Sequence, residues 1–211
     1  MKFTPQLIAS TLLAHLFCLP SLQAEDLFHT PELKLIQKMT DAAIEGGSEE
    51  SNQLVEHLEQ MCESFPKNPI YLAYLGSAYT LKSRDTFPGP SKFSFLKNGL
   101  KTMDKAVKMD PKNPATRFIR AMNNFQLPAI INRRDNARED FSILIKQIED
   151  PEVRKTLDPE TLQAIYYYAG LSFKQLDRKK EAIAAWEKGR LLQANEQLSQ
   201  MILAALSKYG S

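Results

Sequence analysis

Residues 163–196, QAIYYYAGLSFKQLDRKKEAIAAWEKGRLLQANE, are the stretch of this 211-residue sequence that decides its fold. Apolar residues recur at helical spacing on both sides of a break at residues 176–178, which predicts two helices joined by a short turn. A single helical hairpin cannot bury its own apolar face. The stretch therefore predicts further hairpins stacked beside it.

The order of large and small residues in this stretch resembles a tetratricopeptide repeat, a helix-turn-helix unit of 34 residues. Tyr166, Gly170 and Phe173 match the first helix of the motif, and Ala182 and Trp186 match the second. The resemblance implies that Gly170 and Ala182 are positions where the two helices touch. It also implies an all-α, right-handed α-solenoid of about four such hairpins with a C-terminal capping helix.

A second unit begins at Pro69, where Leu72, Gly76 and Tyr79 match the first half of the motif. Its turn is lengthened by residues 84–90, so the unit is longer than the repeat requires. Long loops carry function disproportionately. Phe87 within this insertion is either a plug into the core or an exposed anchor for a partner, and both alternatives stay open.

The unit that begins at Pro114 can be placed in two registers. Strict counting puts three polar side chains at core positions, together with one small residue: Arg117, Arg120, Asn124 and Ala121. A shift of one residue instead turns apolar side chains inward: Phe118, Ala121, Met122 and Phe125. Because polar residues are rarely buried, we expect the shifted register.

Arg117, Arg120 and Asn124 lie on one helical face at the spacing i, i+3 and i+7. That face could bind a carboxylate ligand through two guanidinium groups. It could also pair with the acids of a neighbouring helix, and we expect this second arrangement.

The two ends of the repeat region are also helical in pattern. Thr30 and Pro31 form a helix start, and residues 31–64 read as a hairpin that matches the motif poorly. Asn195 is positioned to cap a last amphipathic helix. A helix there would cover the exposed side of the last repeat.

Residues 1–24 have the order of parts of a secretory signal peptide: Lys2, an apolar run over residues 7–19, and a small residue at position 24. We expect this segment to be removed and residues 25–211 to form a single domain. The predicted location is the bacterial periplasm, with secretion or membrane association through a partner as alternatives. The apolar run is too short for a transmembrane helix, which needs about 20 residues.

The charges of residues 25–211 nearly cancel. Lys2 is the only charged side chain before residue 25, which leaves 26 basic and 25 acidic residues. This balance gives no electrostatic reason to expect nucleic acid or an anionic membrane as the main partner. Cys62 cannot form an internal disulfide; a buried structural thiol is expected, with an intermolecular disulfide or a reactive thiol as the alternatives.

No catalytic motif stands out in the sequence. It contains no HExxH, no GxSxG, no phosphate-binding loop and no dinucleotide fingerprint. His29 and His57 lie on separate segments without metal-ligand spacing, so neither a metal nor a cofactor is predicted. The expectation is a protein without enzymatic activity.

The family resemblance implies a concave groove lined by the first helix of each hairpin. Carried onto this sequence, the groove positions form a mixed surface of aliphatic, aromatic, amide, hydroxyl and positively charged groups: Ser77, Thr80, Ile119, Arg120, Asn123, Asn124, Tyr167, Leu171, Lys174 and Gln175. Amides can hold a peptide backbone while apolar spots hold its side chains. A protein or peptide is therefore the expected partner.

Three functional hypotheses remain. The favoured one is an adaptor or scaffold that binds other proteins through the groove. A fixed subunit of an envelope assembly or transport complex is the second, and it should expose a large apolar patch. The third is an enzyme with an unrecognised site, which would need titratable groups that converge in a closed pocket.

Overall fold

The computed structural model describes residues 30–210, so the predicted signal peptide lies outside the described residues. Within that range the chain is all-α and has no strand. The α-helices are α1 (Pro31–Glu45), α2 (Ser48–Ser64), α3 (Pro69–Asp85), α4 (Pro90–Met109), α5 (Pro114–Gln126), α6 (Arg134–Gln147), α7 (Pro151–Lys155), α8 (Pro159–Gln175), α9 (Lys179–Arg190) and α10 (Glu196–Tyr209). A 3-10 turn, η2 (Ala129–Ile131), precedes α6.

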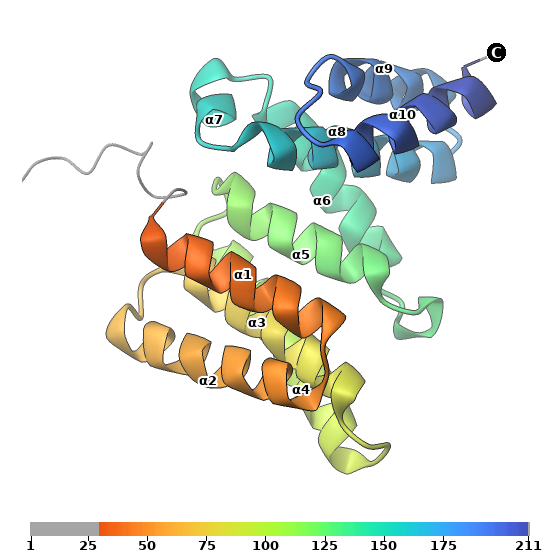
Figure 1. Ribbon diagram of the computed structural model, residues 1–211. Helices are drawn as coiled ribbons and strands as arrows, with labels where there is room; N and C mark the ends of the chain where they lie inside the picture. The colour runs from red at the N-terminus through yellow and green to blue at the C-terminus, as the bar shows by residue number, and fades with distance from the viewer. Residues whose placement is uncertain (1–29, 211) are drawn as a thin grey trace, which may run out of the picture.

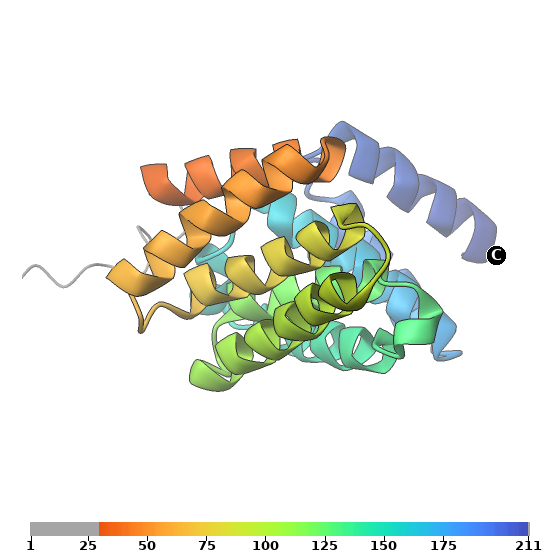
Figure 2. The same cartoon turned by 90° about the horizontal axis from the view of Figure 1, so that it is seen from below.

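Four hairpins follow one another along the chain: α1–α2, α3–α4, α5–α6 and α8–α9. Helix α5 lies between the group formed by α1 to α4 and the group formed by α8 to α10 (Figure 1). Seen from below, α1 and α10 lie on one side of the molecule and α4 lies on the other (Figure 2). Helix α10 packs on α8 and α9. The predicted α-solenoid with a capping helix is confirmed.

Half of the ten α-helices within residues 30–210 begin with a capping side chain followed by Pro. Asn68 Oδ1 accepts hydrogen bonds from the backbone N–H groups of Ile70 at 2.9 Å and Tyr71 at 3.3 Å. Asn113 does the same one hairpin later, at 3.0 and 3.1 Å. Because the first N–H groups of a helix have no partner within it, each cap fixes where its helix starts. The same device opens α1, α7 and α8 at Thr30, Asp150 and Asp158.

Helices α8 and α9 touch where the sequence motif predicts. A Cβ added at Gly170 would lie 2.6 Å from Cδ1 of Trp186, so only the absence of a side chain lets the indole approach. Trp186 is fully buried, and its Nε1 donates to the backbone oxygen of Tyr167 at 3.1 Å. Ala182 is buried beside it. The predicted contact positions of this hairpin are confirmed.

Helices α3 and α4 approach each other through two glycines. A Cβ at Gly76 would lie 2.8 Å from the backbone oxygen of Gly99, and one at Gly99 would lie 2.6 Å from that of Gly76. Met103 lies against the same spot and is fully buried. Gly76 belongs to the recognised motif, whereas the reciprocal role of Gly99 was visible only in the structure.

The α5–α6 hairpin is packed in the register that sequence reasoning rejected. Arg117 is 7% exposed and Asn124 is fully buried, so the strictly counted positions do face the protein interior. Phe118, Met122 and Phe125 are only partly buried, although they too pack on the core. The prediction was wrong because α6 supplies a carboxylate that the burial rule did not consider.

That carboxylate is Asp140, which is fully buried. Its Oδ1 accepts from Arg117 Nη1 at 2.8 Å and from Arg120 Nη2 at 2.7 Å, and its Oδ2 accepts from Arg120 Nε at 2.8 Å. Arg120 Nη1 also lies 3.1 Å from Oδ1 of Asp104 on α4, and Arg133 Nη2 lies 2.6 Å from the same Asp104 oxygen. The expected pairing of the arginines with acids of a neighbouring helix is confirmed.

The apolar core is divided into two clusters of buried residues. One runs from Leu33 on α1 to Ala115 on α5, and the other runs from Ala121 on α5 to Ala205 on α10. Helix α5 therefore contributes its first turn to one cluster and its middle to the other. The two halves of the solenoid meet along this one helix.

Candidate interaction site

The predicted groove residues of α3 and α5 meet in a small polar contact, here called the α3–α5 seam (Ser77, Thr80, Ile119 and Asn123). Asn123 Nδ2 donates to Thr80 Oγ1 at 2.7 Å and to Ser77 Oγ at 3.2 Å. The Thr80 hydroxyl already donates to the backbone oxygen of Ser77 at 2.7 Å, so it must accept from Asn123. This fixes the orientation of the amide and leaves Asn123 Oδ1 buried without a hydrogen-bond partner.

Aliphatic side chains accompany the polar groups of the seam. Ile119 lies one helical turn before Asn123 on α5, and Leu81 lies one turn after Ser77 on α3. Both are partly buried and pack on the N-terminal core cluster. The seam thus combines an amide carbonyl without a partner with partly exposed aliphatic surface.

Three of the predicted groove residues are not available to a partner. Thr80 is 7% exposed, Asn124 is fully buried and Tyr167 is 9% exposed. Asn124 faces the core between α5 and its neighbours, where its Oδ1 accepts from Arg133 Nε at 3.2 Å. The prediction that it lines the groove is wrong, because α5 turns this face inward.

Arg120 belongs to the ion-pair network and not to an open binding face. Burial alone would lower the pKa of Arg120, but its hydrogen bonds to Asp140 and the charges of Asp140 and Asp104 raise that pKa above the ordinary value. The guanidinium therefore stays charged, and it donates three hydrogen bonds to the two carboxylates. The prediction that Arg120 lines the groove is wrong, because its guanidinium points to Asp140 and Asp104.

The C-terminal groove residues form a separate group on α8. Leu171 is partly buried against the C-terminal core cluster. The ammonium group of Lys174 lies 4.9 Å from the ring centre of Tyr209 on α10, and Gln175 Oε1 accepts from Arg138 on α6. These side chains contact the capping helix and α6, and no hydrogen bond joins them to the α3–α5 seam in the described part of the chain.

Two aromatic contacts join α8 to the α5–α6 hairpin within the C-terminal core cluster, and neither was predicted. Phe125 on α5 and Tyr168 on α8 lie edge to face, 5.2 Å between ring centres, and Tyr168 also stacks on Phe141. Burial raises the pKa of the Tyr74 hydroxyl on α3; its hydrogen bond with Gln37 opposes that rise, and the charges of Asp158, at the start of α8, and Asp41 add to it. A run of tyrosines signals helix packing, but it does not say which ring faces which neighbour.

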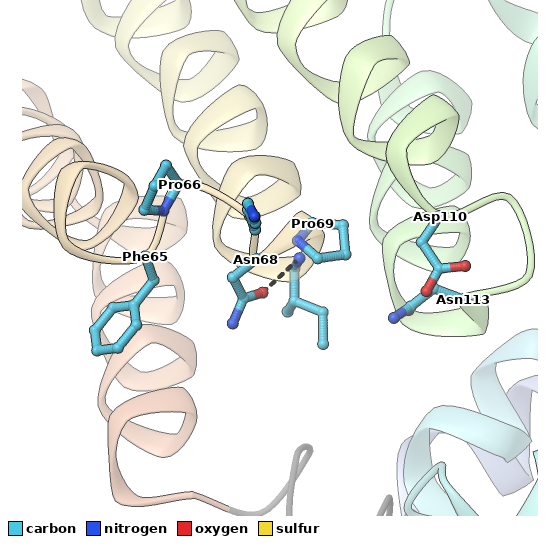
Figure 3. Close-up of a pocket in the computed structure, with 8 residues that line it drawn as sticks. Phe65, Pro66, Asn68, Pro69, Asp110 and Asn113 are labelled. Atoms are coloured by element: carbon cyan, nitrogen blue, oxygen red, sulfur yellow. Dashed lines mark hydrogen bonds between the residues drawn. The ribbon is translucent and has the colours of Figure 1, made fainter.

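A hollow of about 500 Å³ lies between the loop that joins α2 to α3 and the loop that joins α4 to α5. Phe65 and Pro66 stand on one side of it, and Asp110 and Asn113 stand on the other (Figure 3). Both the Asn68 and the Asn113 side chains are occupied in capping the helices that follow. Asp110 is the one carboxylate among the lining residues, so the hollow lacks the converging polar groups that orient a small-molecule ligand.

The insertion between α3 and α4 exposes its aromatic residue. Phe87 is 88% exposed, which excludes the alternative that it plugs the core. The remaining alternative, an exposed anchor, is the one consistent with this position. Phe93, one helical turn into α4, is 69% exposed as well and was not predicted.

The thiol of Cys62, the one cysteine within residues 30–210, lies in an environment that keeps it protonated. Cys62 is free and partly buried, and desolvation raises the pKa of its thiol to about 11, which keeps it protonated near neutral pH. No group of three or more potential metal ligands occurs within residues 30–210. Over the same range, no helix is both long enough and apolar enough to cross a bilayer.

Solved structures provide the comparison that the sequence does not. No protein-family model matches the chain, and no curated protein matches its sequence. The crystal structure of TTC0263, a thermophilic TPR protein in Thermus thermophilus, superposes with a TM-score of 0.58 over 82% of this chain and 78% of that one, at 16% identity. The chain has the tetratricopeptide-type fold.

Two crystal structures of MamA match the chain less well, at TM-scores of 0.48 and 0.47. They cover 76% and 84% of this chain and 80% and 82% of those chains, at 18% and 17% identity. At 16% identity, the similarity to TTC0263 shows the fold alone. The function has to be argued from the side chains of this solenoid.

Proposed function

We propose that this chain is an exported, non-catalytic adaptor that binds an extended segment of a partner protein across the α3–α5 seam. The observation that carries the proposal is the Asn123 amide, whose Nδ2 is held by two hydroxyls while its buried Oδ1 has no partner. A buried acceptor without a partner costs about 1–3 kcal/mol. Because Oδ1 is buried in the unbound chain, a backbone N–H of a bound peptide would recover that cost only after the partly exposed Asn123 side chain shifts to present this oxygen.

The surroundings of the amide support a protein ligand over a small polar one. Ile119 and Leu81 offer partly exposed aliphatic surface within one helical turn of the seam. An extended peptide needs both elements: fixed polar groups for its backbone and apolar spots for alternate side chains. Stacked helical hairpins also present their inner helices as one continuous surface, which suits a segment several residues long.

Site-specific photo-crosslinking in the native cell envelope tests this proposal. A photoreactive residue placed at Ile119 or Leu81 should capture a defined protein, and the same residue at Lys188 on α9 should not. The captured segment, made as a peptide, should bind wild type at least about tenfold more tightly than Asn123→Ala, because a hydrogen bond in a buried site is lost.

Fractionation of cells that carry the chain with and without residues 1–24 tests export. Only the chain that carries residues 1–24 should reach the periplasm.

A stoichiometric partner that binds Asn123→Ala and wild type equally would overturn the seam as the binding site and favour a fixed subunit of an envelope assembly. Enzymatic turnover of any substrate by the purified chain would overturn the non-catalytic role.

A further inference from the structure

The turn between α3 and α4 is held in place although it contributes nothing to the core. Lys92 Nζ donates to the backbone oxygens of Arg84 at 3.0 Å and Thr86 at 3.3 Å. Ser83 Oγ donates to the backbone oxygen of Lys92 at 2.9 Å. Arg84 anchors the turn to the neighbouring hairpin through the backbone oxygen of Ala43 at 2.7 Å. Hydrogen bonds therefore fix the conformation of this turn, which lies at one end of the molecule (Figure 1).

This built turn presents apolar groups to solvent. Phe87 and Phe93 are 88% and 69% exposed, and Pro88 and Pro90 stand between them in the sequence. Ordering a turn costs conformational entropy, and exposing two phenylalanines gives up the gain from burying them. Both costs are recovered if the phenylalanines enter an apolar environment outside the chain.

A row of lysines continues from Phe93 along the outside of α4, here called the α4 lysine row (Lys97, Lys101, Lys105 and Lys108). All four side chains are exposed, and within residues 30–210 none of them forms a salt bridge. At 100° per residue the row lies opposite the face of α4 that packs on α3.

The one carboxylate of α4, Asp104, is already paired with two arginines. Asp104 lines the same shallow hollow as Lys101, Lys105 and Lys108. Its carboxylate forms ion pairs with Arg120 on α5 at 3.1 Å and with Arg133, at the start of α6, at 2.6 Å. The outer face of α4 is thus strongly positive, although residues 25–211 as a whole carry nearly equal numbers of acidic and basic groups.

We propose that the Phe87–Phe93 turn and the α4 lysine row form a peripheral membrane-binding face for anionic lipid. Lysines next to an anionic surface are attracted to lipid headgroups, and aromatic side chains enter the boundary between headgroups and acyl chains. A protein partner fits these residues less well, because lysine is depleted from the cores of protein–protein interfaces. The row spans about 22 Å of helix from Phe93 to Lys108, so several headgroups can be contacted at once.

The two sites occupy different parts of the solenoid. The lysine row is on α4, whose outer side faces away from α1 and α10 (Figure 2), whereas the α3–α5 seam uses the inner helices. The membrane face does not depend on the adaptor proposal. Either can fail while the other stands.

Vesicle co-sedimentation of residues 25–211 tests the proposal. The chain should pellet with phosphatidylcholine vesicles that contain about 30 mol% phosphatidylglycerol and stay in solution with phosphatidylcholine alone. Raising the salt from about 0.05 M to about 0.5 M should release it, because the headgroup attraction is screened. Wild type that stays in solution with the anionic vesicles at low salt would overturn the proposal.

A charge-matched pair of variants locates the binding face. Replacing the four lysines of the α4 row by Gln should weaken partitioning at least about tenfold. The control replaces four exposed lysines on other helices by Gln and removes the same net charge: Lys34, Lys38, Lys180 and Lys188. It should bind nearly as well as wild type. Equal losses in the two variants would show a nonspecific charge effect and overturn the proposal.

A fluorescence measurement separates insertion from simple adhesion. Trp186 is fully buried, so a tryptophan introduced by Phe87→Trp supplies the new exposed signal. Its emission should shift to shorter wavelength when anionic vesicles are added, while that of Phe65→Trp should not move. An unchanged Phe87→Trp emission spectrum when the chain is bound to vesicles would overturn the role of the turn. Binding of an acidic protein to this face, by a chain that does not bind anionic vesicles, would also overturn the proposal.

Discussion

The hairpins α8–α9 and α5–α6 occupy equivalent places in the solenoid, yet their helices are held together by different chemistry. In α8–α9, Trp186 closes on Gly170 and the contact is made of apolar surface. In α5–α6, Phe141 fills the corresponding place and contacts Phe125, but Arg117 and Arg120 around the buried Asp140 add a set of ion pairs to the contact. The difference teaches that an inner position of a repeat can take a charged side chain when a neighbouring helix brings an opposite charge to it.

The largest effect is expected from Asp140→Ala. Removing the carboxylate leaves the guanidinium groups of Arg117 and Arg120 buried without it, which should lower the free energy of unfolding by about 3–5 kcal/mol. Urea unfolding followed by circular dichroism measures the loss. The matched control is Asp135→Ala on the same helix, whose exposed pair with Arg138 should contribute less than about 1 kcal/mol.

A triple variant shows whether the polar contact itself stabilises the hairpin. Arg117→Met, Arg120→Leu and Asp140→Leu together replace the buried charges by apolar groups. Such replacements are often neutral or stabilising, so the triple variant should recover most of what Asp140→Ala loses. A triple variant no more stable than Asp140→Ala would show that the network stabilises the solenoid beyond filling its core.

A smaller effect is expected from Gly170→Ala in the apolar hairpin. The new methyl group would lie 2.6 Å from Cδ1 of Trp186, so the indole has to move and the free energy of unfolding should fall by about 1–3 kcal/mol. Trp186 emission should shift to longer wavelength as its packing loosens. At Gly47 a Cβ meets nothing within 4 Å, and Gly47→Ala serves as the control. Equal stability of the two variants would contradict the close contact.

The smallest effect concerns Cys62, which packs on the N-terminal core cluster and reports on the other half of the solenoid. Desolvation raises the pKa of its thiol from 9.0 to about 11, so the unfolded chain ionises first as the pH rises. The stabilisation is complete below pH 9 and is lost between pH 9 and about 11. Comparing unfolding of wild type and Cys62→Ser across that range measures it.

The reactivity of the same thiol shows whether the two halves open together. At neutral pH the protonated thiol should react slowly with a disulfide reagent, because the thiolate is the nucleophile. In Asp140→Ala the reaction should become faster if α5 couples the two core clusters. An unchanged rate together with a large loss of stability would show that the halves unfold separately.

The sequence by itself determined the close contacts of the α8–α9 hairpin and the starts of several helices. Gly170, Ala182 and Trp186 predict their hairpin because helix contacts of this kind depend on local spacing and on side-chain size. The capping residue and Pro at Asn68 and Asn113 fix helix starts for the same reason. Each of these features is decided within a few residues of the chain.

Only the tertiary structure decided what happens to the polar side chains. Whether Arg117 or Asn124 can be buried depends on Asp140 and Arg133, which lie outside α5 and whose distances to it no local pattern contains. The same holds for the seam, where Asn123 meets residues more than forty positions earlier in the chain. Burial of a polar group depends on its partner, and the fold decides which partner arrives.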